Sequence, residues 1–261
     1  MSLLAGLSCL LASPLAVVRP RRGFVADTRN GTCADPTLLS NTGWYYDYNV
    51  EDPYRGDLGC TTGGPQPFVP MHWCLSSLGK PIPGYVDQTW MLGFNEPNNI
   101  HNCGAHTDAL QIAQAWGQVM HDYPSSKLVS PATSGDGRQW FREFFGNCTA
   151  LYGSTGCNVT HMAVHSYTCD AKRMHTYLEE VHHEFKLPIW LTEFACGDHA
   201  DHQPLDKQLA FMKEILPILD SSNIVFRYAW MAARQGADDH RGLLVPGKSE
   251  LTELGQLYNS L

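Results

Sequence analysis

The chain has 261 residues, of which 43% are hydrophobic and 17% are charged. This size and composition suit one folded domain with a large core, because single β/α barrels reach about 250 residues. The formal net charge is -8, and no run of Lys or Arg follows the basic segment near the N-terminus. We therefore expect no nucleic-acid partner, since surfaces that bind nucleic acid are strongly basic.

The first 18 residues carry no charge and are rich in Leu and Ala. Such a run is shorter than a membrane span and is typical of a secretory signal peptide, although no basic residue precedes it. The alternative is a strand or hairpin that plugs the bottom of the fold. We expect a cleaved leader at 1–18, a mature domain at 19–261 and no contact with a membrane.

Cysteines and glycosylation motifs also favour export. Of nine cysteines, eight remain if Cys9 leaves with the leader. An even number without a Cys-x-x-Cys pair favours disulfide bonds over a zinc site. Three Asn-x-Thr motifs, at Asn30, Asn147 and Asn158, are possible acceptors of N-linked glycans. The sequence therefore predicts a secreted glycoprotein with disulfide bonds, located outside the cell or in the cell wall.

Short apolar runs and helical patterns alternate along the rest of the chain. The runs are residues 23–27, 44–48, 68–73, 89–94, 127–131, 161–167, 189–194 and 224–231. Apolar residues recur at helical spacing over 107–122, 170–185 and 204–219. Strands that alternate with helices form parallel sheets, and eight of them close most naturally into a barrel. We predict an α/β fold, a (β/α)8 TIM barrel whose first-half helices are trimmed, because mainly loops separate the early runs.

Two glutamates end apolar runs in the same way. Glu96 follows the run 89–94, and Glu193 lies at the end of the run 189–194. Barrel active sites lie at the carboxyl ends of strands, so the two side chains would meet across the mouth. Glycoside hydrolysis needs such a pair, with one carboxyl protonated and the other ionised. Burial and repulsion should raise the pKa of one of them. The alternative for either residue is a salt bridge at the rim.

Aromatic residues occur at other predicted strand ends, where they can stack on the CH faces of sugars. We expect Tyr46, Trp73, Tyr167 and Trp230 to bind substrate, whereas Trp44 and Trp190 suit the core and the site equally well. His165 precedes Tyr167 by two residues, so both side chains lie on one face of a strand. A buried histidine with a structural role is the alternative for His165.

Other histidines do not form a convincing metal site. His182 and His183 are adjacent on a predicted helix, so their side chains point in different directions. The cluster at 198–202 precedes Pro204 and is typical of a loop before a helix. We expect no metal and no cofactor.

Taken in order, seven segments resemble glycoside hydrolase family 128, the endo-β-1,3-glucanases with a compact (β/α)8 catalytic core. The resemblance is collinear from about residue 22 to residue 258. The segments are Trp-Tyr-Tyr-Asp-Tyr at 44–48, Phe-Val-Pro-Met-His-Trp at 68–73, Leu-Gly-Phe-Asn-Glu-Pro-Asn at 92–98, Leu-Val-Ser-Pro-Ala at 128–132, Ala-Val-His-Ser-Tyr at 163–167, Pro-Ile-Trp-Leu-Thr-Glu-Phe-Ala at 188–195 and Tyr-Ala-Trp at 228–230.

The resemblance implies a retaining enzyme that cleaves within β-1,3-glucan chains. It assigns Glu96 as the acid/base, Glu193 as the nucleophile and Asn95 as a hydrogen-bond partner of the sugar 2-hydroxyl. It also favours a sugar hydrogen bond, or support of Glu193, for His165. Retention predicts carboxyl groups about 5–5.5 Å apart. The Gly- and Pro-rich loop at 52–70 departs from the family and leaves the fine structure of the substrate open.

The disulfide pairing cannot be deduced, because eight cysteines allow 105 pairings. Proximity in the chain and in the predicted barrel favours four pairs: Cys33–Cys60, Cys74–Cys103, Cys148–Cys157 and Cys169–Cys196.

The sequence thus predicts a monomeric glycoside hydrolase, a retaining endo-β-1,3-glucanase that binds β-glucan polysaccharide or oligosaccharide. One alternative keeps the barrel and acts on mannan or mixed-linkage glucan. The other is a glucan-binding protein without activity, which would be expected to lack one carboxylate.

Overall fold

A computed structural model describes residues 19–102, 108–198, 201, 203–236 and 238–261. The predicted leader lies outside these residues. Seven parallel strands form one curled sheet in the order β2-β1-β7-β6-β5-β4-β3. The strands are β1 (Arg19–Val25), β2 (Thr42–Tyr46), β3 (Trp90–Leu92), β4 (Lys127–Thr133), β5 (Val159–Ser166), β6 (Ile189–Phe194) and β7 (Val225–Trp230).

An extended segment closes the sheet between its two edge strands. Residues 68–73 were predicted as a strand, but they form only isolated parallel bridges, to Tyr45 of β2 and to Leu92 of β3. Pro70 within the segment has no amide hydrogen, so a regular ladder cannot form there. The barrel wall therefore consists of seven strands and this one extended segment. This confirms the (β/α)8-type fold and corrects the third strand.

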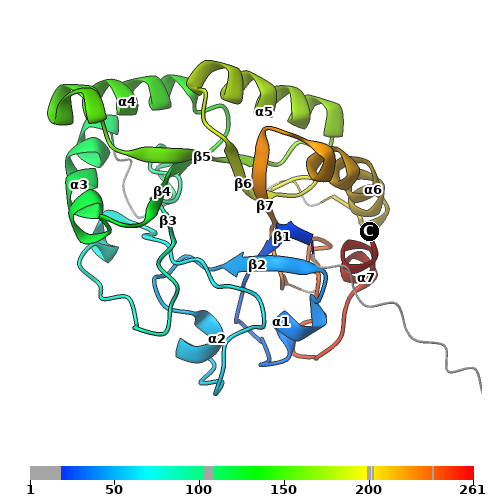
Figure 1. The fold of residues 1–261 in the computed structure, drawn as a ribbon. Helices are drawn as coiled ribbons and strands as arrows, with labels where there is room; N and C mark the ends of the chain where they lie inside the picture. Colours follow the sequence, from blue (N-terminus) through cyan, green and yellow to red (C-terminus); the bar gives the residue numbers. More distant parts are fainter. Residues whose placement is uncertain (1–18, 103–107, 199–200, 202, 237) are drawn as a thin grey trace, which may run out of the picture.

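Long helices cover the outer face of the second half of the sheet, as Figure 1 shows. The three predicted helices correspond to α3 (Ala109–Asp122), α5 (Ala171–Phe185) and α6 (Leu205–Ser221), and α4 (Arg138–Tyr152) follows β4. Side-chain caps define two starts, since Asp108 and Asp170 each accept a backbone amide in the first turn. Within the described ranges, every helix is too short or too polar to cross a bilayer.

The first half of the barrel has only short helical turns, as predicted. They are α1 (Asp35–Leu38), α2 (Pro53–Gly56) and the 3-10 turn η1 (Leu75–Ser77). A second 3-10 turn, η2 (Gly153–Thr155), follows α4, and α7 (Glu253–Ser260) ends the chain.

The core has two layers, one between sheet and helices and one inside the barrel. Three tryptophans fill the inside. The ring centroid of Trp190 lies 4.9 Å from that of Trp44 and 5.1 Å from that of Trp90. Trp44 and Trp190, for which the sequence left two roles open, are therefore core residues. Because Trp90 and Trp190 lie near the starts of their strands, these rings close the amino end of the barrel and leave the carboxyl end for a site.

Three of the four predicted disulfide bonds are confirmed. Their Cα–Cα distances are 5.8, 5.1 and 4.3 Å for Cys33–Cys60, Cys148–Cys157 and Cys169–Cys196 respectively. The pairing of Cys74 with Cys103 stays a prediction, because Cys103 lies outside the described residues.

A buried ion pair ties the first helical turn to the C-terminal loop. Arg234 donates to both oxygens of Asp35 at 2.7 and 2.6 Å, and both side chains are at most 1% exposed. Arg234 also donates to the carbonyl oxygen of Lys248 at 2.9 Å. The guanidinium thus holds two segments that are far apart in sequence.

We expect Asp35→Ala to lower the free energy of unfolding by about 3–5 kcal/mol, because it leaves a buried guanidinium unpaired. Urea denaturation would measure the change. Asp136→Ala is the control. It breaks the ion pair between Arg138 and Asp136, whose carboxylate side chain is 53% exposed, and should lower the free energy of unfolding by about 1 kcal/mol or less. Equal costs for both variants would contradict the role of burial.

Candidate active site

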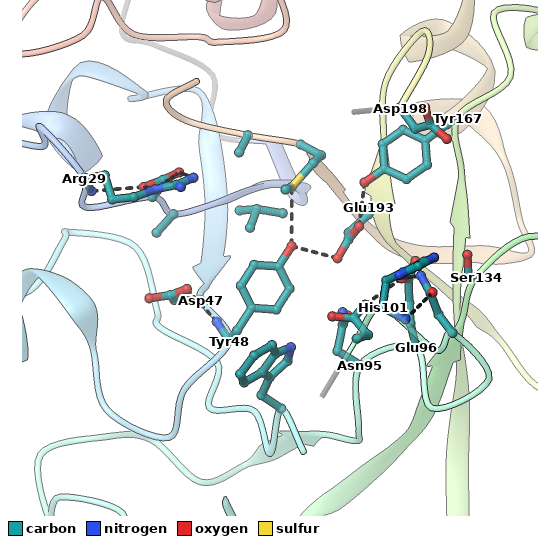
Figure 2. Close-up of a pocket in the computed structure, with 18 of the residues that line it drawn as sticks. Arg29, Asp47, Tyr48, Asn95, Glu96, His101, Ser134, Tyr167, Glu193 and Asp198 are labelled. Carbon is teal, nitrogen blue, oxygen red and sulfur yellow. Dashed lines mark hydrogen bonds and ion pairs between the residues drawn. The ribbon is translucent and has the colours of Figure 1, made fainter. Parts of the chain in front are cut away.

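A cavity of about 690 Å³ opens at the carboxyl ends of the strands. Figure 2 shows its polar side chains converging from several strand ends. Five predicted site residues line it: Trp73, Asn95, Glu96, Tyr167 and Glu193. Both glutamates therefore reach one cavity, from the loop after β3 and from the end of β6.

Two tyrosine hydroxyls hold the Glu193 carboxylate. Tyr48 donates to Oε1 at 2.7 Å and Tyr167 donates to Oε2 at 2.5 Å, as Figure 2 shows. Burial, and then the charge of Glu193, raise the pKa of both phenols well above the usual value. The tyrosines therefore stay protonated and act as donors. Glu193 itself is 5% exposed, so these bonds replace the water that a carboxylate would otherwise bind.

Glu96 is held by the loop that follows β3. Its φ is 43°, in the left-handed region that few residues other than glycine adopt. The amide of Glu96 donates to the carbonyl of Ala132 at 2.7 Å, and this bond ties the strained residue to β4. Oε2 accepts from the side-chain amides of Asn99 and Asn102 at 2.9 and 2.6 Å. Strain of this kind costs about 1–3 kcal/mol and is concentrated at functional sites.

His165 lies between the two carboxylates. Its Nδ1 is 2.9 Å from Oε1 of Glu96 and 3.4 Å from Oε2 of Glu193, and the side chain is 2% exposed. One ligand atom from each of these three residues falls within 4.8 Å of the others. The acidic pair is therefore a compact, buried group that shares one imidazole.

The charges of this group shift two pKa values. Burial by itself raises the pKa of Glu96, but the hydrogen bond and charge of His165 and the Asn99 and Asn102 amides outweigh it and lower the pKa to about 2. Burial lowers the pKa of His165, and Glu193 and Glu96 together raise it above the usual value. The expectation was that burial and repulsion would raise the pKa of one of the two carboxyls. At Glu96 the pKa is lowered, because the donors around this buried carboxylate matter more than its burial.

Among the described residues, the same three side chains are the one group close enough to hold a metal ion. All four carboxylate oxygens already accept hydrogen bonds, from Tyr48, Tyr167, Asn99, Asn102 and His165. A metal bound there would share these oxygens with the hydrogen-bond donors, which orient the two carboxylates around one imidazole.

Asn95 and Trp73 present their side chains to the cavity. Asn95 is 4% exposed, and its Oδ1 has no hydrogen-bond partner. A buried acceptor of this kind is expected to receive a donor from a ligand. Trp73 lines the cavity and is 40% exposed.

Three predicted site residues do not line the cavity. Trp230 is completely buried on the helix side of β7, next to Phe194, and its indole donates to the carbonyl of Arg241 at 2.8 Å. Tyr46 is buried inside the barrel and donates to the carbonyl of Thr192 at 3.0 Å. His165 contacts the carboxylates from below the surface. For Trp230 and Tyr46 this corrects the expected contact with substrate.

Tyr48, Asn99 and Asn102 hold the two carboxylates but were not among the predicted site residues. Tyr48 lies two positions after Tyr46, and the two rings meet edge to face at 5.8 Å. Because side chains two positions apart in extended chain share a face, Tyr48 lies one layer closer to the mouth. The sequence signal that could have identified Tyr48 is that the alternation of aromatic residues at 44 and 46 continues to position 48, beyond the end of the strand.

Residues 23–258 match the glycosyl hydrolase catalytic core family. The chain belongs to this family. The expected resemblance to glycoside hydrolase family 128 is confirmed. A subgroup II endo-β-1,3-glucanase of that family from Sorangium cellulosum is 29% identical, with a TM-score of 0.74 over 92% of this chain and 98% of the other. The chain is a glycoside hydrolase by family.

Two further proteins are similar. A subgroup V exo-β-1,3-glucanase of family 128 from Cryptococcus neoformans is 24% identical, with a TM-score of 0.73 over 91% of this chain and 97% of the other, and shares the fold. Alkali-sensitive linkage protein 1 of Schizosaccharomyces pombe is 28% identical over 236 residues. The match covers 87% of this chain but 42% of that protein, so the chain spans less than half of its length.

The lowered pKa of Glu96 predicts how stability depends on pH. A group whose folded pKa lies below its usual 4.5 stabilises the fold above that pH, and the contribution is lost as the pH falls toward 2. Between pH 5 and pH 2, we expect the free energy of unfolding of the wild type to fall by about 3 kcal/mol more than that of Glu96→Gln. Denaturant unfolding at several pH values would measure it. Glu143→Gln, at an exposed carboxylate of α4, is the control; a pH-independent gap between wild type and Glu96→Gln would contradict the prediction.

Tyr48→Phe removes one donor from Glu193 and should lower kcat for glycoside hydrolysis about tenfold to a hundredfold, because hydrogen bonds to charged groups contribute about 1.5–3 kcal/mol. Steady-state kinetics would measure the loss. Tyr152→Phe is the control, because it removes a hydroxyl that donates to backbone carbonyls of α3 outside the cavity, and it should change kcat by less than about twofold. Similar losses in both variants would contradict the role of the Tyr48 hydroxyl.

Proposed function

We propose that this chain is a retaining endo-β-1,3-glucanase that hydrolyses β-1,3-glucan by double displacement. The observation that carries this proposal is the pair of buried carboxylates, Glu96 and Glu193, whose oxygens approach within 4.8 Å in one cavity. Retaining enzymes have carboxyl groups about 5–5.5 Å apart, whereas inverting enzymes need about 6.5–9.5 Å to admit a water molecule. The short distance supports retention.

Glu193 is the nucleophile. It attacks the anomeric carbon and forms a glycosyl-enzyme, while the bond to the leaving sugar breaks. The hydroxyls of Tyr48 and Tyr167 hold the carboxylate in position. Their protonated state supports this role, since a donor fixed before the reaction needs no reorganisation during it.

Glu96 is the acid/base. It donates a proton to the leaving oxygen and then removes one from the water that hydrolyses the glycosyl-enzyme. The pKa of Glu96 is lowered and that of His165, whose Nδ1 lies 2.9 Å from Oε1 of Glu96, is raised, and both shifts favour the proton on the imidazole in the free site. In this proposal the imidazole returns the proton to Glu96 when substrate binds and excludes water.

Asn95 and Trp73 bind the sugar. The unpartnered Oδ1 of Asn95, beside the acid/base, is available to accept a hydrogen bond from the 2-hydroxyl. Trp73 lines the cavity and is 40% exposed, and indole rings of this kind stack on the CH faces of sugars. Tyr167 also lines the cavity, and its hydroxyl donates to Glu193, so its ring lies next to the nucleophile.

Endo action is supported by the 29% identical relative, which is an endo-β-1,3-glucanase. Exo action, or cleavage of mannan or mixed-linkage glucan, is the alternative within the same chemistry. A glucan-binding protein without activity is disfavoured because both carboxylates are present and hydrogen-bonded. We also propose that the protein is secreted and acts as a monomer; the three disulfide bonds support the export.

We expect the wild-type protein to release reducing sugars from laminarin, and Glu96→Ala and Glu193→Ala each to lower that rate by at least about a thousandfold while the thermal transition remains. Mixed product sizes at early times would indicate endo action, and NMR of the first product would give its anomer. Glu143→Ala is the control for a carboxylate outside the cavity. Activity in either active-site variant, or an inverted product, would refute the proposed roles.

A further inference from the structure

The hydroxyl that positions Glu193 also touches a sulfur atom. Tyr48 Oη lies 2.7 Å from Oε1 of Glu193 and 3.4 Å from Sδ of Met231. Met231 follows β7 and lines the cavity. The phenol has a single proton, and a thioether is a weak acceptor, so the proton goes to the carboxylate.

Among the methionines that the structure describes, Met231 is the one that lines the cavity. Met120, on α3, is also half-buried but lies outside the cavity. The remaining described methionines are buried: Met71, Met91, Met162, Met174 and Met212. A small polar oxidant that enters the cavity therefore meets the sulfur of Met231 next to the nucleophile's support.

We propose that Met231 is an oxidation site through which hydroperoxides inactivate the enzyme. The sulfur attacks one peroxide oxygen, the O–O bond breaks, an S–O bond forms, and the leaving oxygen takes up a proton. For hydrogen peroxide the products are methionine sulfoxide and water. Sulfur loses two electrons and the peroxide gains them, so the step needs no other reactant.

The sulfoxide changes the hydrogen bond of Tyr48. A sulfoxide oxygen is polar and accepts hydrogen bonds strongly, so it competes with Oε1 of Glu193 for the single phenol proton, which the thioether does not. The added oxygen atom also lies beside Tyr48 Oη and draws the hydroxyl away from Oε1. The hydrogen bond by which Tyr48 positions the nucleophile is thereby weakened. This step rests on the proposed role of Glu193, and we expect kcat to fall at least about tenfold.

Thiol oxidation does not offer a competing route in the described part of the chain. Every described cysteine is disulfide-bonded: Cys33, Cys60, Cys74, Cys148, Cys157, Cys169 and Cys196. Loss of activity in peroxide can therefore be traced to methionine by substitution.

The test compares wild type, Met231→Leu and Met120→Leu after timed exposure to hydrogen peroxide and removal of the excess. Residual kcat on laminarin and peptide mass spectrometry, which detects the added oxygen atom, are measured together. Wild type and Met120→Leu should fall to about a tenth of their starting rates as Met231 is oxidised. Met231→Leu, compared with its own untreated rate, should keep most of its activity.

A second variant reproduces the polar acceptor without peroxide. Met231→Gln should start with a low kcat and an intact thermal transition. The inference is overturned if Met231→Leu loses activity as fast as wild type, or if wild type with fully oxidised Met231 keeps its rate. Failure of the proposed function looks different: the untreated enzyme then has no turnover on laminarin at all, which overturns both.

Discussion

Two buried carboxylates within 4.8 Å of each other would repel strongly, and the imidazole of His165 between them makes the arrangement possible. The other donors of the site complete the same requirement. Two tyrosines donate to the two oxygens of Glu193, two asparagines donate to Oε2 of Glu96, and His165 lies beside Oε1 of Glu96, so that each oxygen has a partner. The site thus keeps two negative charges buried by giving them hydrogen-bond donors in place of the water that substrate displaces.

The two ends of the barrel differ: the amino end holds packed aromatic residues, and the carboxyl end holds the polar residues of the site. At the amino end, Trp44, Trp90 and Trp190 pack together, and the guanidinium of Arg227 lies 4.8 Å from the ring of Trp190. At the carboxyl end, the side chains are polar and several carry strain or unsatisfied atoms. A rigid, apolar floor allows the strained conformation of Glu96 to persist, because the surrounding core resists the small shifts that would relieve it.

Much of the fold could be predicted because its signals are local. Helical spacing located α3, α5 and α6, and apolar runs located the seven strands. The segment 68–73 has the same apolar composition, but its proline prevented a ladder. The carboxylates were predictable for a similar reason: a glutamate that follows an apolar run lies at the carboxyl end of a parallel strand wherever the strand lies in the barrel.

The order of strands and helices and the two acidic positions could be predicted from the amino-acid sequence alone, because they depend on spacing along the chain. Which aromatics face the cavity depended on the tertiary structure. Trp230 and Tyr48 both lie near strand ends, yet one packs under the helices and the other holds Glu193. The tertiary structure also set the sign of the Glu96 pKa shift, because His165 reaches that carboxylate from a strand 69 residues away, and the donors that surround a charge are known only when the strands have met.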